Sequence, residues 1–228
     1  MYLVIDKQTN NIIHTNNHPY NNLTNIEAYA LFDESKHACI FAKMYNPQYH
    51  KIENFKVVGR TPKEITEFRI ENGIDSPLTN SQKIDDDGNI IEKTNKEKYL
   101  DGILIESYYK ELLIDNLTNV INNKFNTVIE SGTTYKDKNF QANEISCNRI
   151  NNAITFSETS GIVTPYWIAS DNSVYQIIDL EDLKNLGLTI GNCFQSNFFK
   201  RTQLRDSLIT KTIEQLENYS VEMEWGIL

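Results

Sequence analysis

The sequence predicts an α+β protein in which short β-hairpins and capped helices precede a long helix and a C-terminal domain of hairpins and helices. Short β-prone runs flank clusters of Asp, Asn and Gly. Two segments carry the Thr-x-x-Glu pattern of a capped helix start. Apolar residues recur with helical period from 106 to 130 and near the C-terminus. These observations divide the chain into a modular N-terminal region at 1–104, a connecting helix at 105–132 and a C-terminal α+β domain at 133–228.

The composition is typical of a globular protein, because 39% of its 228 residues are hydrophobic. The net charge of −9 disfavours nucleic-acid binding, which needs a clustered basic face. Cys39, Cys147 and Cys193 are far apart in sequence, so we expect reduced thiols rather than disulfides or a zinc site. No apolar run reaches the ~18 residues of a membrane span, and the first residues lack signal-peptide character. We expect a protein made in the cytoplasm, without membrane insertion.

The first hundred residues favour short elements. We expect a β-hairpin from 2–5 and 12–15, a short helix over 25–32 and a strand over 38–44. Two similar units follow, at 57–74 and 90–103. Each has an apolar β-prone pair, a Thr-x-x-Glu helix start and a Gly after the helix. Two copies are too few for a solenoid, so we interpret them as small spacer modules.

Two patterns in this region resemble metal sites, and we expect neither to bind a metal. His14 and His18 have the spacing of two ligands on one helical face, but the intervening Asn residues and the following Pro disfavour a helix. The segment that begins at Asp85 resembles a calcium loop, yet Gly88 occupies its fourth position rather than its sixth. A hairpin turn between flanking apolar strands explains those residues better.

A long amphipathic helix is predicted from 106 to 130, ending at Gly132. Its length would be about 37 Å at the usual rise per residue. Such a helix could connect two domains, associate with copies of itself, or pack on its own chain. Its expected apolar side comprises Leu113, Leu117, Val120, Ile121, Phe125 and Val128.

The C-terminal region alternates hairpins and helices. We expect a tight hairpin at 135–140, a helix from Asn143 to about 156, and a hairpin over 167–178 whose turn is 170–173. A helix capped by Asp179 follows, with a break at 187–191, and then a final helix over 194–219.

These elements carry characteristic residues in a fixed order: Tyr135 and Phe140, then Asn143, Glu144, Arg149 and Ile150, then Trp167-x-Ala169-x-Asp171-Asn172, then Asp179, Leu180 and Leu183. The succession resembles a phage-encoded domain of otherwise unassigned function that recurs at the C-terminal end of tail-fibre, baseplate-associated and tail-fibre-assembly proteins. The resemblance covers about the last ninety residues, a compact domain size. Two positions depart from it, since we would expect Gly near Lys138 and Asp at Asn143.

The resemblance implies a non-enzymatic structural component of a phage or phage-like tail, either a tail fibre or a baseplate-associated protein. Such a chain would be assembled in the host cytoplasm and would reside in the virion. Its expected partners are other tail proteins and further copies of itself, with a host surface glycan as an additional candidate. We expect no cofactor and no metal. The alternatives are a tail-fibre assembly chaperone and a glycan-binding or glycan-cleaving receptor-recognition protein.

Four residues of the last hairpin are the candidate binding residues: Trp167, Asp171, Asn172 and Tyr175. An aromatic ring beside Asp and Asn could stack on and hydrogen-bond a sugar or a partner's backbone. Alternatively, Trp167 fills the seam between hairpin and helices while Asp171 and Asn172 form the turn, and we favour this structural interpretation. The sequence contains no Gly-x-Ser-x-Gly, Walker or Gly-x-Gly-x-x-Gly motif, and no carboxylate pair stands out for acid–base catalysis.

Overall fold

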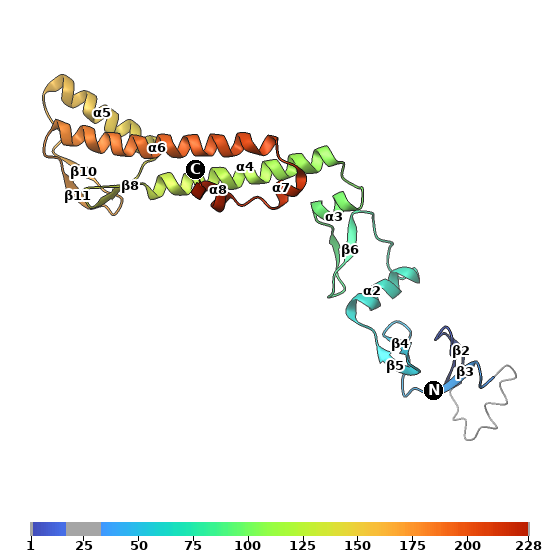
Figure 1. Ribbon diagram of the computed structural model, residues 1–228. Helices are drawn as coiled ribbons and strands as arrows, with labels where there is room; N and C mark the ends of the chain where they lie inside the picture. Colours follow the sequence, from blue (N-terminus) through green and yellow to red (C-terminus); the bar gives the residue numbers. More distant parts are fainter. Residues whose placement is uncertain (1, 17–32, 228) are drawn as a thin grey trace. The chain divides into compact units, whose positions relative to one another are not determined.

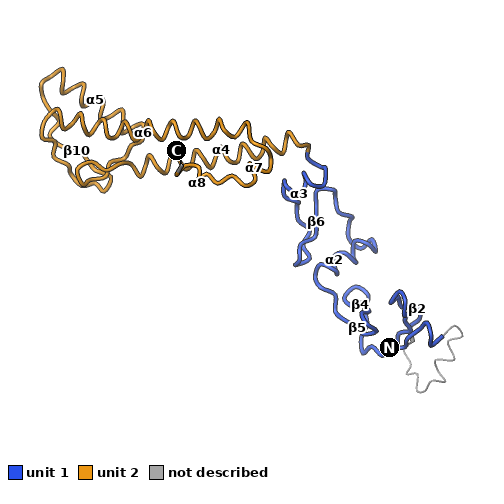
Figure 2. Tube along the Cα trace, in the orientation of Figure 1, with its two compact units in different colours: residues 1–104 blue, residues 105–228 orange. Residues whose placement is uncertain are grey.

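The computed structural model describes residues 2–16 and 33–227, with only the backbone described for Asn16 and Ile227. Its contacts divide the chain into two compact units, 1–104 and 105–228 (Figure 2). The division falls at the end of the expected modular region, and the helix expected to connect the two parts lies inside the second unit. Strands and helices occur in both units, which confirms the α+β class.

The first unit opens with a three-stranded antiparallel sheet of order β2-β1-β3. The expected N-terminal hairpin is confirmed, with Asp6 accepting hydrogen bonds from the amides of residues 8 and 9 in its turn. Leu3 and Ile5 are fully buried and form a small core with Ala42. The expected helix over 25–32 and His18 lie outside the described residues. The strands are β1 (Tyr2–Asp6), β2 (Ile12–Asn16) and β3 (His37–Phe41).

Two hairpin–helix modules make up the rest of the first unit (Figure 1). Both capping boxes form as predicted, at Thr61 and at Thr94, and the Gly after each helix has positive φ. The hairpin turn at Asp87 and Gly88 is also confirmed. The first module comprises β4 (His50–Glu53), β5 (Lys56–Gly59) and α2 (Pro62–Glu71). The second comprises β6 (Gln82–Ile84), β7 (Ile90–Glu92) and α3 (Asn95–Leu100).

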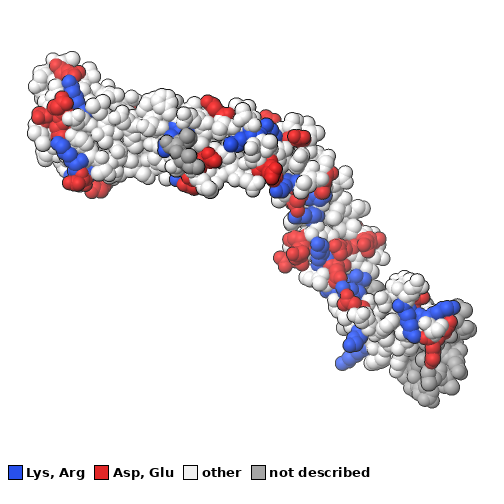
Figure 3. Space-filling model, viewed as in Figure 1, with Lys and Arg blue, Asp and Glu red and all other residues white. Residues whose placement is uncertain are grey.

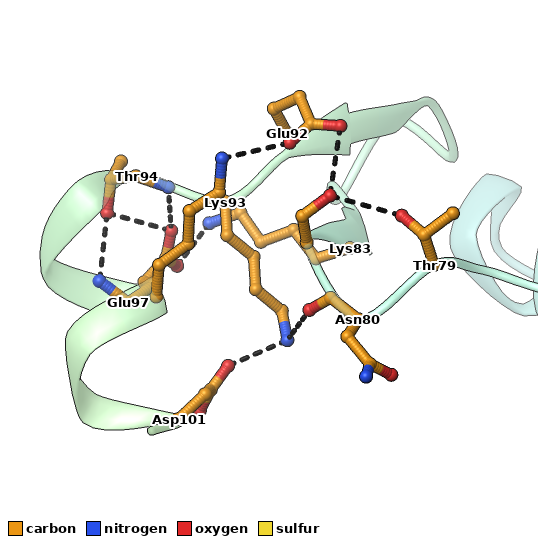
Figure 4. A network of polar contacts seen from close by, with 10 residues as sticks. Thr79, Asn80, Lys83, Glu92, Lys93, Thr94, Glu97 and Asp101 are labelled. Atoms are coloured by element: carbon orange, nitrogen blue, oxygen red, sulfur yellow. Dashed lines mark hydrogen bonds and ion pairs between the residues drawn. The ribbon is translucent and has the colours of Figure 1, made fainter. Parts of the chain in front are cut away.

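The two modules share one hydrogen-bonding scheme. In each, a lysine on the first strand pairs with the capping-box glutamate, Lys51 with Glu64 at 2.5 Å and Lys83 with Glu97. Figure 4 shows the second module, where Lys93 also reaches back to the carbonyl oxygen of residue 80 at 2.9 Å and to the carboxylate of residue 101 at 2.7 Å. The sequence had not indicated β4, because its polar residues hide the strand pattern.

The second unit is built on two long helices, α4 (Glu106–Ser131) and α6 (Leu180–Ile209), which lie side by side (Figure 1). Two short helices, α7 (Ile213–Glu217) and α8 (Val221–Ile227), pack against them. Of the roles considered for this long helix, the structure shows packing on its own chain, because the apolar side of α4 contacts α6, α7 and α8. Together the four helices enclose the helical core, which comprises Ile121, Phe125, Ile129, Leu204, Leu208, Leu216, Val221 and Trp225.

The other end of the second unit holds a second core, the hairpin core, between two hairpins and two helices. Its buried members include Phe140, Ile150, Tyr175, Leu183 and Leu186. The elements are β8 (Thr133–Tyr135), β9 (Lys138–Phe140), α5 (Glu144–Ser160), β10 (Tyr166–Ile168) and β11 (Val174–Gln176), together with the first half of α6.

Three predictions about this unit were wrong. The expected break at 187–191 is absent, and α6 continues through it. The expected final helix over 194–219 ends at Ile209, because Thr212 and Gln215 form a capping box that begins a new helix. Val120 on α4 is 49% exposed, whereas Tyr109 and Ile129 are buried.

Gly187 explains the missing break. A Cβ atom there would lie 2.7 Å from the Cδ1 atom of Ile154 on α5. The glycine therefore allows close approach of two helices and does not interrupt one.

Candidate functional site

The expected hairpin over 167–178 forms, and its turn residues take the roles that the structural interpretation assigns them. Asp171 accepts hydrogen bonds from the amide and the hydroxyl of Ser173, which lower the pKa of its carboxyl group. Asn172 has φ of 63°, in the left-handed region that Asn tolerates. Trp167 and Tyr175 face each other across the strand pair and so lie on the same face of the hairpin.

Tyr175 belongs to the hairpin core, where it joins a buried polar network around Asp182 of α6. Asp182 is only 5% exposed. Its carboxylate accepts hydrogen bonds from the hydroxyls of Tyr135 and Tyr175, each at 2.9 Å to Oδ1, and from the amide of Ile178 at 3.1 Å. Lys136 forms an ion pair with it at 2.6 Å. The network ties both hairpins to the start of α6.

The pKa values in this network follow from burial and pairing. Burial alone would raise the pKa of Asp182, but the hydrogen bonds from Lys136, the Ile178 amide and the two tyrosines outweigh it and lower that pKa to about 2. Burial and the hydrogen bond to the carboxylate raise the pKa of both Tyr135 and Tyr175. The hydrogen bond to Asp182 also raises the pKa of Lys136. All four groups are therefore fixed in their usual charge states at neutral pH, as expected of a structural clamp.

A cavity of about 400 Å³ lies between β10, the hairpin turn and the beginning of α5. Trp167 and Asn172 line it, whereas Asp171 and Tyr175 do not. Of the four candidate binding residues, Trp167 and Asn172 line this cavity, although Trp167 also packs against the hairpin core and Asn172 also belongs to the turn. Asp171 lies in the turn and Tyr175 in the core. The remaining lining residues are Gln141, Ser146, Arg149, Thr164, Tyr166, Ile168, Ala169 and Ser170.

Arg149 is the one charged residue that lines the cavity, and the sequence did not indicate a binding role for it. Asn143 caps α5 by accepting a hydrogen bond from the Ser146 amide at 2.9 Å. It therefore serves as the N-cap residue at the position where the resemblance leads us to expect Asp. Arg149 follows Ser146 by three residues, which places both on one helical face. That spacing was readable from the sequence, but the position of β10 opposite it was not.

The described residues meet neither the requirements of a metal site nor those of a membrane-spanning helix. Among residues 2–16 and 33–227, no group of three or more His, Cys, Asp or Glu is placed to hold a metal ion. The same residues include no helix with the length and apolar character to cross a membrane. The three cysteines are free and partly buried, and burial raises the pKa of each thiol.

Comparison with known families finds a match within the second unit. Residues 114–221 match the family model "Domain of unknown function (DUF4376)". The match runs from the first half of α4 to the start of α8 and so includes the hairpin core, the cavity and every member of the helical core except Trp225. No curated protein and no solved structure matches the chain.

Proposed function

We propose that this protein is a non-enzymatic structural component of a phage or phage-like tail, a fibre or baseplate-associated protein that attaches to other tail proteins. The observation that carries the proposal is the lack of a core in the two hairpin–helix modules. None of the residues from 43 to 104, all of which the structure describes, is buried. Hydrogen bonds of caps and turns define these modules, and their apolar side chains remain available to a partner.

The exposed apolar side chains of the modules support an attachment role. Ordered segments normally need buried apolar surface to offset the conformational entropy lost on folding. A partner that covers the apolar side chains of the modules would supply this buried apolar surface. They are Met44, Tyr49, Phe55, Ile74, Ile90, Ile91, Leu100 and Ile103, each between 37% and 71% exposed.

Further copies of the chain are the partners we expect first, together with neighbouring tail proteins. Symmetric association is the commonest way in which such surfaces are covered. Nucleic acid is a poor candidate, because the face drawn in Figure 3 intersperses Lys and Arg with Asp and Glu and shows no continuous basic area over the described residues.

Mass spectrometry of purified particles tests the proposal. A structural component should be present in a fixed ratio to other tail proteins. Absence from the particles, with the protein abundant in the lysate, would favour the tail-fibre assembly chaperone instead. Degradation of host polysaccharide by the purified protein, lost on mutation of a carboxylate pair, would favour an enzyme.

A further inference from the structure

The cavity beside β10 contains hydrogen-bonding groups that the protein itself does not use. Arg149 is the one charged residue among those that line it. Within the described part of the chain, Arg149 has no ion-pair partner. The side chains of Gln141, Trp167 and Asn172 likewise have no hydrogen-bond partner among those residues. The cavity thus presents an unpaired cation and several free donors to solvent.

Neighbouring cations at this end of the unit are engaged, which sets Arg149 apart. Lys136 pairs with Asp182 at 2.6 Å, Lys184 pairs with Glu158 at 2.7 Å, and Lys138 donates to the hydroxyl of Ser173 at 2.6 Å. Because Arg149 is the one charged residue that lines the cavity, the local charge favours an anionic ligand, although the net charge of the chain is −9.

We propose that this cavity binds a carboxylated sugar, such as a hexuronic acid residue of a polysaccharide. The guanidinium of Arg149 presents a planar pair of donors that matches a carboxylate. Trp167, which is among the lining residues, can supply an aromatic ring on which a sugar ring can lie. The amides of Gln141 and Asn172 can each donate to and accept from sugar hydroxyls. This binding activity is separate from the proposed attachment role and does not depend on it.

The size and the polar content of the cavity favour a sugar over an acidic peptide side chain. A volume of about 400 Å³ is within the range of small-molecule sites. A single aspartate or glutamate would satisfy Arg149 but would leave the amides and hydroxyls of the wall unpaired. A uronic acid has one carboxylate and several hydroxyls, so it can engage both.

Binding can be measured on the whole protein with digalacturonic acid as the probe. The chain has two tryptophans, and Trp225 belongs to the helical core, so a Trp225→Phe background leaves Trp167 as the fluorescent reporter. We expect a saturable change in emission. Isothermal titration of the unmodified protein provides a second measurement that does not depend on the background substitution.

Matched variants and ligands identify the contacts. Arg149→Gln should weaken binding about tenfold or more, because a charged hydrogen-bond donor is lost. Arg205→Gln on the exposed side of α6 removes the same charge away from the cavity and should leave binding unchanged. The dimethyl ester of the probe, which lacks the negative charges, should bind as weakly to the natural protein as the acid binds to Arg149→Gln.

Three results would overturn the proposal. One is the absence of saturable binding of digalacturonic acid at millimolar concentration in both measurements. Another is equal binding by the Arg149→Gln and Arg205→Gln variants. The third is binding of the peptide Gly-Asp-Gly in preference to the sugar acid, which would assign the cavity to a protein partner.

Discussion

At the scale of single residues, Asp182 is the side chain on which the hairpin core depends most. It is a buried carboxylate whose four donors come from both hairpins and from the segment that enters α6. A buried charge is tolerated only when it is paired and hydrogen-bonded, and here both conditions hold. Its location could not be read from the sequence, because Tyr135 and Asp182 are 47 residues apart.

Replacing Asp182 by Asn should destabilise the second unit. The substitution removes the charge that Lys136 pairs with and one of the acceptors of the tyrosine hydroxyls. Because Lys136 is half-exposed, solvent offsets part of the loss, and we expect a cost of about 2 kcal/mol or more in the free energy of unfolding. Urea denaturation of both proteins measures it. Asp206→Asn, at an exposed position of the same helix, is the control, and an equal effect there would contradict the network's role.

The same carboxylate makes stability depend on acid pH. Its pKa is lowered from 3.8 to about 2 in the folded protein. The contribution is therefore fully present above pH 3.8 and is lost as the pH falls towards 2, amounting to about 2 kcal/mol. The difference in unfolding free energy between the natural protein and Asp182→Asn should shrink over that interval. A difference that stays constant from pH 6 to about pH 2 would exclude this linkage.

At the scale of elements, local chemistry made most starts and ends predictable. Capping boxes, hairpin turns and the helix-ending Gly132 each depend on a few neighbouring residues, and the structure places them where the sequence indicated. The failures involve distant contacts. Gly187 permits close packing of α5 on α6, and no local pattern distinguishes such a glycine from a helix breaker. For the same reason, the cavity beside β10 could be predicted only in part, through Trp167 and Asn172.

Gly132 should be far less replaceable than the other helix-ending glycine of this unit. It has φ of 77° and ψ of −151°, a region that only glycine adopts readily, and a Cβ atom would lie 1.9 Å from the carbonyl oxygen of Phe140. We expect Gly132→Ala to cost more than about 3 kcal/mol, against about 1 kcal/mol for Gly161→Ala, where φ is also positive but space is open. Thermal unfolding compares them. Equal losses of unfolding free energy in the two variants would show that stability does not depend on the close approach of Gly132 to the Phe140 carbonyl group of β9.

Gly191 offers a direct test of the continuous α6 helix. A Cβ atom there meets no other atom within 4 Å. Since alanine has a higher helix propensity than glycine, Gly191→Ala should raise the unfolding free energy by roughly 0.5–1 kcal/mol. Gly187→Ala should gain less, because its Cβ displaces the end of the Ile154 side chain. Destabilisation by Gly191→Ala would instead support a break in the helix.

At the scale of the whole molecule, the two units differ in how they are stabilised. The second unit has two cores of large buried side chains, whereas the buried residues described in the first unit are Leu3, Val4, Ile5 and Ala42. The first unit therefore relies on caps, turns and ion pairs such as that of Lys51 with Glu64. Partly exposed ion pairs of that kind contribute little free energy, so association should matter more for this unit.

Separate fragments should reveal that difference. We expect 105–228 to unfold cooperatively and independently of concentration, and 1–104 to be marginally stable unless its concentration is raised. Circular dichroism melts over a range of protein concentrations measure both. If the melting temperature of 1–104 is high and independent of concentration, the modules are stable without a partner, and the attachment role loses its support.

One pattern recurs in both units, since each of four hairpins is followed within three residues by the cap of a helix, at Thr61, Thr94, Asn143 and Asp179. Such units depend on local contacts, so each can form rapidly as it leaves the ribosome. The helical core cannot, because Ile121 and Phe125 of α4 pack with residues of α6, α7 and α8 that come much later in the chain. During synthesis the apolar side of α4 therefore stays uncovered until α6, α7 and α8 have emerged, and we expect the nascent protein to be most prone to aggregate during this interval.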